Sequence, residues 1–311
     1  MIKEYQMRIH NMDMRHFFLY GAMDSIKRKT GIVFRIGNKR VYSEYEMSKK
    51  SMKLSRMYQK TILEGVTVNK PRVKNRIIWV CWLQGFNKTP PIVNACLNSI
   101  KRVAQNSNYT VKCVDEKNIL EYIELPKSVL EKHKKGIVGS AHFSDIIRTA
   151  LLCKYGGIWI DATVLFTSER IPNYINSTGF FFFQDINWGN LDRPSSILSN
   201  WLISSDSNNP ILLLTLKMLY QYWNKYDYPI HYFIYHMLFS LAAERYPDEL
   251  RLVPVYSNEP PRILNRELDN RFDENRWIQI TKMSEVHKLK WKVNYDDRDS
   301  MLSYIIETFG D

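Results

Sequence analysis

The sequence contains no long hydrophobic run. None of its apolar stretches approaches the roughly 20 residues that a membrane-spanning helix requires. Residues 1–6 also lack the uninterrupted apolar core of a secretion signal. These two absences predict a cytoplasmic protein, and they make the three Asn-x-Ser/Thr triplets of the chain chance matches and not glycosylation sites.

Cysteine is scarce, and its spacing does not suggest a metal site. The four cysteines include no Cys-x-x-Cys pair and lie inside apolar stretches. Such positions predict buried, reduced thiols and disfavour a disulfide or zinc framework. Internal repeats and low-complexity tracts are also absent. A chain of 311 residues with 45% apolar residues is therefore expected to form one large globular domain, alone or with an appendage.

Positive charge is concentrated at one end of the chain. Residues 1–76 contain 18 Lys and Arg against 6 Asp and Glu, a net charge of +12, and the remaining residues contain 26 of each. A basic arm of this kind suggests contact with an anionic membrane surface or another polyanion. The alternative is a solvated face that keeps the protein soluble.

The N-terminal region is expected to be a mainly helical extension, residues 1–70, before a main domain of residues 71–311. Residues 12–29 have the pattern of an amphipathic helix that ends in three basic residues, which suits the helix dipole. A hairpin is expected over 32–42, around a Gly-Asn turn. A second helix is expected over 44–63, closing at Gly65.

Strands and helices then alternate. Apolar strands are expected at 76–82 and 109–114, with a helix from Pro91 to about residue 103 between them. Further elements are expected at 116–122 and 127–135 (helices), 179–183 (strand), and 210–226 and 229–246 (helices). This alternation predicts an α/β fold with a parallel sheet wound by helices.

The most informative stretch is 141–163. A helix with Asp145 and Arg148 on one side ends at a Gly-Gly pair, and a short buried strand follows. Along that strand Ile158 and Ile160 are expected to face one way, and Trp159 and Asp161 the other. Asp161 thus stands at the carboxyl end of a strand, where open α/β sheets bind ligands.

This stretch resembles the donor-site signature of glycosyltransferases of the capsular polysaccharide synthesis type. The resemblance rests on Ser-Asp-x-x-Arg followed by Gly-Gly-Ile-Trp-x-Asp-x-Thr, and it extends over about residues 71–292. The wider family includes yeast mannosyltransferases and clostridial glucosylating toxins. It implies a GT-A-like, Rossmann-type mixed sheet flanked by helices, and a nucleotide-sugar donor that we expect to be a UDP-sugar. Asp145, Arg148 and Trp159 belong to the matching motif and are expected to face the nucleotide and donor sugar.

A tryptophan of the first strand extends the resemblance. Trp82 matches the tryptophan with which the family's first strand stands beside the nucleotide base, and Trp79 occupies the place of a histidine. An aromatic ring stacked on a base contributes about 1–3 kcal/mol in single-strand binders. We therefore expect Trp82 at the base and Trp79 in the core.

The metal site implied by the family is altered in this chain. The wider family has Asp-x-Asp where this sequence has Asp161 and Thr163. Residues 285–292 resemble a late His-Lys-Leu element, so Asp161, Thr163 and His287 are the candidate ligands for Mn²⁺ or Mg²⁺. Lys288 and Lys290 are the candidate phosphate contacts. The alternative is that Arg148 and these lysines compensate most of the phosphate charge, or that the 285–292 segment is an ordinary basic strand.

Two polar residues after the strand at 179–183 are further candidates. Asp185 and Asn187 follow directly on a buried strand and are expected to contribute, with Asp161, to sugar recognition and transfer. A loop of this composition is often only a loop.

The predicted function is transfer of a sugar to a growing, lipid-linked capsular or other cell-surface polysaccharide, on the inner face of a bacterial membrane. Retention of the anomeric configuration is implied by kinship. One alternative is a catalytically inactive partner subunit, which the threonine in the Asp-x-Asp position favours. A basic nucleic-acid-binding protein is the other, but the positive charge is confined to the arm and no nucleic-acid-binding signature occurs.

Overall fold

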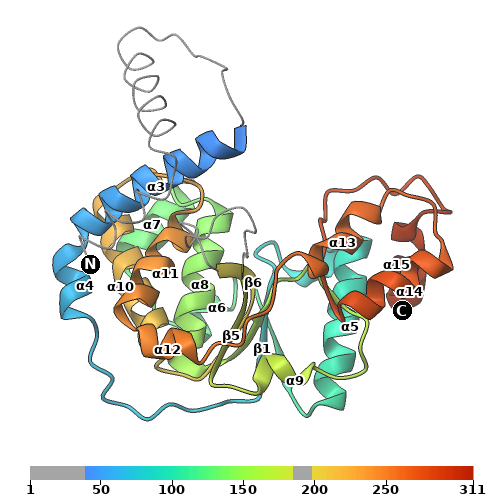
Figure 1. The fold of residues 1–311 in the computed structure, drawn as a ribbon, viewed down its shortest axis with the longest axis horizontal. Coiled ribbons are helices and arrows are strands. Elements are labelled where there is room, and N and C mark those ends of the chain that lie inside the picture. Colours follow the sequence, from blue (N-terminus) through green and yellow to red (C-terminus); the bar gives the residue numbers. More distant parts are fainter. Residues whose placement is uncertain (1–38, 185–197, 311) are drawn as a thin grey trace, which may run out of the picture.

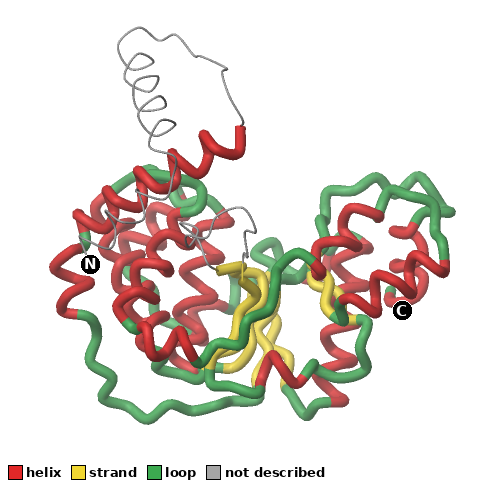
Figure 2. The backbone as a smooth tube through the Cα atoms, in the orientation of Figure 1, coloured by secondary structure: helices red, strands yellow, loops and turns green. Residues whose placement is uncertain are grey.

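A five-stranded mixed sheet lies between two groups of helices (Figure 1, Figure 2). The computed structural model describes residues 39–184 and 198–310. The elements expected at 12–29 and 32–36, and the candidates Asp185 and Asn187, lie outside these ranges. No helix within the described ranges is long and apolar enough to cross a membrane.

The strands follow the order β2-β1-β3-β6-β5 across the sheet. Their bounds are Ile77–Cys81 (β1), Thr110–Val114 (β2), Gly157–Ile160 (β3), Phe180–Gln184 (β5) and Leu198–Ser205 (β6). β1 pairs in parallel with β2 and β3, and β6 pairs antiparallel with β3 and β5. The expected mixed, helix-flanked α/β sheet is confirmed. β6 was not predicted, because its eight residues mix serine, asparagine and apolar side chains without alternation.

The order of the first three strands opens a crevice. α5 (Pro91–Asn106) joins β1 to β2, and α8 (Ser140–Tyr155) leads from the β2 side into β3. The first connection runs outward from β1 to β2, whereas the second crosses back past β1 to reach β3 on its other side, and α5 and α8 pack on opposite faces of the sheet. Such a switch point leaves room outside the carboxyl ends of the two parallel strands. Trp82 follows β1 and Asp161 follows β3, so both residues are positioned at this crevice.

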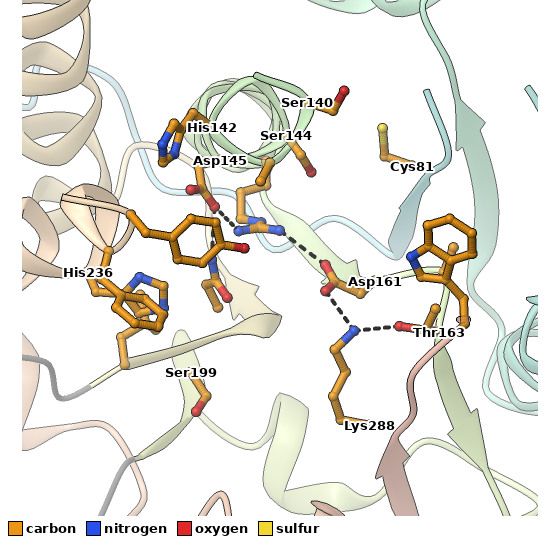
Figure 3. A pocket seen from close by; sticks show the side chains of 18 of the residues that line it. Cys81, Ser140, His142, Ser144, Asp145, Asp161, Thr163, Ser199, His236 and Lys288 are labelled. Atoms are coloured by element: carbon orange, nitrogen blue, oxygen red, sulfur yellow. Dashed lines mark hydrogen bonds and ion pairs between the residues drawn. The ribbon is translucent and has the colours of Figure 1, made fainter. Parts of the chain in front are cut away.

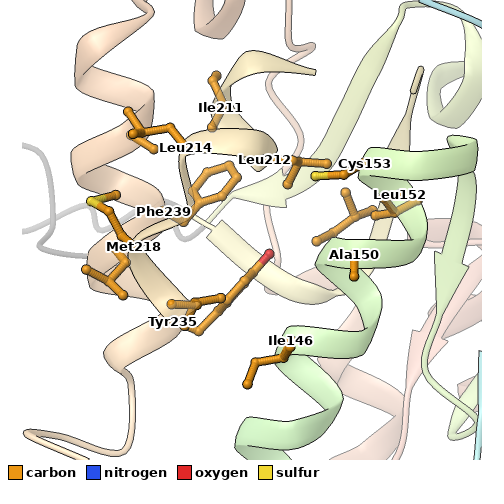
Figure 4. Packing of buried hydrophobic residues seen from close by; sticks show 14 of the residues in the cluster. Ile146, Ala150, Leu152, Cys153, Ile211, Leu212, Leu214, Met218, Tyr235 and Phe239 are labelled. Atoms are coloured by element: carbon orange, nitrogen blue, oxygen red, sulfur yellow. The ribbon is translucent and has the colours of Figure 1, made fainter. Parts of the chain in front are cut away.

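One face of the sheet packs on α8, α10 (Pro210–Lys225) and α11 (Ile234–Arg245). Figure 4 shows this packing, in which α8 contributes residues such as Ile146 and Ala150 and α11 contributes Tyr235 and Phe239. Apolar residues at helical spacing along α8 are buried core: Phe143, Ile147, Ala150 and Leu151. The alternation of β3 is confirmed, because Trp159 lies in this cluster, whereas Ile158 and Ile160 lie in the cluster on the opposite face.

The opposite face packs on α5 and on C-terminal elements that the sequence did not reveal. These are α13 (Pro260–Glu267), α14 (Glu274–Met283) and α15 (Met301–Phe309). A separate two-stranded sheet pairs β4 (Val164–Phe166) antiparallel with β7 (Val286–Lys288). This small sheet brings the C-terminal segment back to the strand exit at Asp161. The remaining short helices are η1 (Phe86–Lys88), α6 (Ile119–Tyr122), α7 (Lys127–Lys134), α9 (Asn173–Asn176) and α12 (Pro247–Arg251).

The described part of the N-terminal region is helical. α3 (Lys39–Met57) and α4 (Gln59–Glu64) replace the single helix expected over 44–63, and the chain leaves α4 at Gly65 as predicted. The strand expected at 39–42 is wrong, because these four residues form the first turn of the 19-residue α3. Leu54, Tyr58 and Ile62 join the core cluster that contains α10 and α11. The domain boundary near residue 70 stays a prediction.

Gly157 explains why the Gly-Gly pair precedes β3. Its φ is +95°, a conformation that side chains disfavour, and a Cβ atom there would lie 2.4 Å from the carbonyl oxygen of Ile77. Glycine therefore allows β3 to approach β1 closely as the chain turns out of α8. Of the four free cysteines, Cys96 and Cys153 are buried as expected, whereas Cys81 and Cys113 are only partly buried.

Candidate functional site

A cavity of about 630 Å³ lies at the carboxyl ends of β1 and β3. Side chains from the β1 exit, α8, the β3 exit, β6, α13 and β7 line it. The volume is that of a typical small-molecule site. Cavity and crevice coincide, as the strand order requires.

The Asp161 carboxylate lies at the centre of the cavity (Figure 3). Its Oδ1 accepts hydrogen bonds from Trp159 Nε1 at 2.9 Å and Arg148 Nη2 at 3.1 Å, and its Oδ2 lies 3.1 Å from Lys288 Nζ. Burial raises the pKa of Asp161, but the positive charges of Lys288 and Arg148 outweigh burial and hold this pKa below its usual value. Asp161 is therefore ionised at neutral pH.

Arg148 links Asp161 to Asp145. Its Nη1 donates to Asp145 Oδ1, which also accepts a hydrogen bond from Asn200 Nδ2 at 2.8 Å. Burial raises the pKa of Asp145 to about 6, although Arg148 acts in the opposite direction. The guanidinium lies 5.0 Å from the centre of the Trp159 ring, a cation–π distance. Asp145 and Arg148 are thus a buried pair and not the surface ion pair that their spacing alone would also allow.

Lys288 enters the cavity from β7. Its ammonium contacts Asp161 Oδ2 and donates to Thr163 Oγ1, so that Asp161, Thr163 and Lys288 form one connected group (Figure 3). The placement follows from the register of the small sheet, in which Lys288 lies opposite Val164 and His287 opposite Leu165. Since successive side chains of a strand point to opposite faces, only one of these two residues reaches the cavity.

His287 is the residue that turns away. Its side chain is fully buried, does not line the cavity, and has Nε2 3.3 Å from Thr167 Oγ1. Burial lowers the pKa of His287 to about 3, so the ring is neutral. The expectation that His287 joins Asp161 and Thr163 is therefore wrong. Lys290 also lies outside the cavity, and its Nζ is 2.7 Å from Asp269 Oδ2.

The side chains at this site do not fit the expected Mn²⁺ or Mg²⁺. Such ions prefer several oxygen ligands, with carboxylates among them. Here Asp161 is the single carboxylate of the expected set, it is already paired with two cations, and Thr163 accepts from one of them. Across residues 39–184 and 198–310, no group of three or more His, Cys, Asp or Glu side chains could hold a metal.

An aromatic pair closes one part of the cavity. Trp82 and Trp291 both line it, with ring centroids 5.7 Å apart and planes at 86°. Trp82 is half-buried and Trp291 is 43% exposed, so both rings present surface to a ligand. Sequence analysis singled out Trp82 but not Trp291, because Trp291 follows β7 and nothing local connects it to the first strand.

The other two predicted tryptophans are structural. Trp79 is 1% exposed and donates through Nε1 to the carbonyl of Gly156 at 3.0 Å, as expected of a core residue. Trp159 is equally buried and does not line the cavity, so the expected donor contact is not formed by its ring. It acts on the site through Asp161, which it holds by the hydrogen bond from Nε1.

Besides Trp291, three cavity residues that bear on the chemistry of the site were missed by sequence reasoning. Asn200 is on the unpredicted β6, and Arg262 is on the unpredicted α13. Arg262 has no ion-pair partner among the residues that the structure describes. Two adjacent prolines begin α13, which is a helix-start signal, but the direction of Arg262 depends on the tertiary packing. The third is Cys81, whose pKa burial raises to about 12, so its thiol is no nucleophile at neutral pH.

Comparison with known proteins places this geometry in a family. The family model described as capsular polysaccharide synthesis protein matches residues 30–307. The chain belongs to the capsular polysaccharide synthesis protein family. The match includes α3 and α4, which sequence analysis had left outside the resemblance, and it includes the whole network from Asp145 to Lys288.

Two further similarities were found for this family member. It is 23% identical to the O-glycosyltransferase braB of Annulohypoxylon truncatum over 200 residues, covering 55% of this chain and 43% of that protein. The match thus spans less than half of that relative's length. The solved structure titled PaToxG Glycosyltransferase matches with a TM-score of 0.39 and 15% identity, over 67% of this chain and 83% of that one. At this TM-score the match establishes neither a shared fold nor a shared activity.

Proposed function

We propose that the protein is a glycosyltransferase that moves a sugar from a nucleoside diphosphate to a hydroxyl of a growing cell-surface polysaccharide. One observation carries the proposal: a chain of alternating charges crosses a cavity at the switch point of an α/β sheet. It runs from the buried pair Asp145 and Arg148 to the partly buried pair Asp161 and Lys288. Membership of the capsular polysaccharide synthesis family and the O-glycosyltransferase named among its relatives support the same reaction class.

The reaction places two demands on the protein. The bond between the anomeric carbon and a diphosphate oxygen breaks, and its electron pair leaves with the nucleoside diphosphate. The acceptor hydroxyl oxygen forms the new bond to the anomeric carbon, and its proton passes to the departing phosphate oxygen. Negative charge therefore grows on the diphosphate, and fixed positive charges placed there lower the barrier. Retention, with attack on the face that the diphosphate leaves, is proposed from the family resemblance.

The cavity offers separate places for the parts of the donor. Trp82 and Trp291 suit the flat face of a base, for which we propose uracil. Arg148, Lys288 and Arg262 suit the diphosphate, since Arg262 has no acidic partner in the described chain to neutralise it. Asp145 and Asn200 carry hydrogen-bonding groups suited to ribose or sugar hydroxyls. Asp185 and Asn187 remain proposed contacts that lie outside the described residues.

The acceptor and the location are further parts of the proposal. We propose a polyprenyl-diphosphate-linked glycan as acceptor, because capsule chains grow on lipid carriers at the inner face of the membrane. The excess of +12 within residues 1–76 supports a location at that anionic surface. The protein would then work in the cytoplasm, as a peripheral protein of the membrane.

Thermal stabilisation and mass spectrometry test the proposal together. The full chain is heated with UDP, GDP, CDP or ADP in turn, and it is incubated with the matching nucleotide sugars and a lipid-linked glycan. We expect one nucleotide to raise the melting temperature, since a ligand at 100 times its Kd adds about 2.7 kcal/mol to the free energy of unfolding. The matching donor should add one sugar mass to the glycan. Stabilisation without transfer of any sugar would favour the inactive partner subunit. If no nucleotide stabilises the protein and no sugar is transferred, the proposed function is contradicted.

A further inference from the structure

We infer that the Lys288 ammonium occupies the place that a divalent cation takes in an Asp-x-Asp site, and that this protein binds its donor diphosphate without a metal ion. The inference rests on the proposed function and specifies how its diphosphate charge is balanced. Its starting point is the connected group of Asp161, Thr163 and Lys288.

The two side chains at the Asp-x-Asp positions share one cation. Asp161 Oδ2 lies 3.1 Å from Lys288 Nζ, and Thr163 Oγ1 accepts from the same nitrogen. A metal ion bound by the first and second acids of such a motif would need the same space between these two side chains. The lysine fills that space with a single positive charge, as Figure 3 shows.

Thr163 suits a lysine better than an aspartate would. One carboxylate and one ammonium sum to zero charge, and the hydroxyl adds an acceptor without adding charge. An aspartate at 163 would leave this group with a net negative charge, which would repel a diphosphate unless a metal joined it. Threonine at position 163 and lysine at position 288 therefore complement each other, since together with Asp161 they form a group of zero net charge.

The lysine is fixed in the cavity by backbone pairing. Lys288 lies opposite Val164 in the antiparallel β4–β7 pair. The backbone N–H of the next residue, Leu289, donates to the Thr163 carbonyl at 2.9 Å. An ammonium has three donors, of which Asp161 and Thr163 take two. The third remains for a phosphate oxygen of the donor.

Other charges at the site agree with a diphosphate held by cations of the protein. Arg262 also lines the cavity, and no carboxylate of the described chain pairs with it. Glu259, the third acid of the lining, is held by Arg266 at 2.8 Å. A divalent cation at Asp161 would instead lie beside Arg148 and Lys288, two positive charges that repel it.

Calorimetry on the full chain tests the inference. The nucleotide that stabilises the protein, among UDP, GDP, CDP and ADP, is titrated once in buffer with EDTA and once in buffer with excess Mn²⁺. We expect its Kd to agree within about twofold between the two buffers, where a tenfold change would be 1.4 kcal/mol. Binding that appears only with Mn²⁺ would overturn the inference and leave the proposed function standing. If none of the four nucleotides binds in either buffer, the proposed function fails and the inference with it.

A lysine variant and a matched control locate the effect. Lys288→Met keeps most of the side-chain length and removes the charge, so it should weaken diphosphate binding about 10- to 100-fold, as expected for loss of a charge-assisted hydrogen bond. The monophosphate of the same base should lose less. Lys290→Met, two residues on and outside the cavity, should leave both affinities unchanged. Equal effects of the two variants would contradict a role for Lys288. The Mn²⁺ comparison needs no variant, so it decides the metal question even if Lys288→Met does not fold.

The converse change supplies a second test. Thr163→Asp combined with Lys288→Ala creates two acids and removes the ammonium. We expect this double variant to bind the nucleotide at least tenfold more tightly with Mn²⁺ than with EDTA, while the wild-type protein shows no such difference. A double variant that binds equally well in both buffers would contradict the exchange of lysine for metal.

Discussion

Two regions build the cavity in different ways. The segment 145–163 supplies Asp145, Arg148 and Asp161 from one helix and one strand that follow directly on one another. The C-terminal region supplies Arg262 and Lys288 from α13 and β7, elements whose placement depends on packing and on pairing with β4. The first region carries a motif that can be recognised from spacing, and the second carries cations that only the assembled fold brings to it. Asp145, Asp161 and one proposed phosphate-binding cation, Arg148, therefore come from one short segment, and the other two cations come from the C-terminal region.

The largest expected effect comes from breaking the residue on which both regions converge. Asp161→Asn keeps the shape of the side chain but removes the charge that Arg148 and Lys288 share. We expect transfer to fall about 100- to 1000-fold, the range found when one fixed electrostatic contact of an active site is lost. Donor turnover by mass spectrometry measures this.

Asp269→Asn is the matched control for that change. It removes the partner of Lys290 at the protein surface, where an ion pair contributes little. We expect nearly full transfer from this variant and an almost unchanged melting temperature. Full activity in Asp161→Asn would remove Asp161 from the site.

A smaller effect separates the two tryptophans at the cavity. Trp82→Ala should weaken binding of the base-matched nucleotide by about 1–3 kcal/mol, the usual contribution of a stacked aromatic ring. Trp291→Ala should weaken binding less, because the Trp291 ring is 43% exposed whereas Trp82 is half-buried. Calorimetry measures both. Unchanged affinity in Trp82→Ala would show that Trp82 does not contact the base. A larger loss in Trp291→Ala than in Trp82→Ala would show that the base stacks mainly on Trp291.

A pair of phenylalanine variants tests how β3 supports Asp161. Trp159→Phe removes the Nε1 hydrogen bond to Asp161 and keeps an aromatic ring in the core, so turnover should fall about tenfold with a smaller change in nucleotide affinity. Trp79→Phe, on the neighbouring strand β1, removes the hydrogen bond from Nε1 to the carbonyl of Gly156, which precedes β3. Trp79→Phe should lower the free energy of unfolding about as much as Trp159→Phe does, but it should leave turnover unchanged. Equal turnover in the two variants would contradict a positioning role for Trp159.

The smallest expected effect is a pH dependence that belongs to Asp145. Burial raises the pKa of Asp145 to about 6, so transfer should decline modestly below that pH, because protonation weakens the pair with Arg148. Asp161 stays charged over this range, because its pKa is lowered. A pH–rate profile of Asp145→Asn should lack the decline. If the decline persists in that variant, another group causes it.

The same pKa values give opposite trends in stability. The folded-state pKa of Asp145 lies above its ordinary value of 3.8, so this group favours folding at low pH, and that contribution is lost as the pH rises toward about 6. Asp161 has a lowered pKa, so its contribution is present above the unfolded pKa and is lost as the pH falls through the folded one.

The sequence was sufficient for the parts of the fold that depend on local pattern. The helix α8, the Gly-Gly turn and the alternation along β3 follow from spacing, which is why Asp161 could be placed at a strand exit. β6 could not be found, since a strand buried between two others needs no alternation. His287 was expected at the metal and Lys288 at the phosphate, but neighbouring residues of a strand face opposite ways. Which of the two enters the cavity is set by the register of β7 with β4, which the sequence does not show.

Because Lys288 reaches the cavity only through the β4–β7 pairing, the chain must extend past β7 before this ammonium can lie beside Asp161. Ribosomal synthesis delivers the Gly-Gly motif well before β7, so an intermediate that ends ahead of Val286 holds Asp161 with Arg148 but without Lys288. A shortened gene product would keep the recognisable signature and lack the ammonium beside it. We therefore expect homologues that end before this point to keep the sequence motif of a transferase but to lack the lysine that we propose binds phosphate.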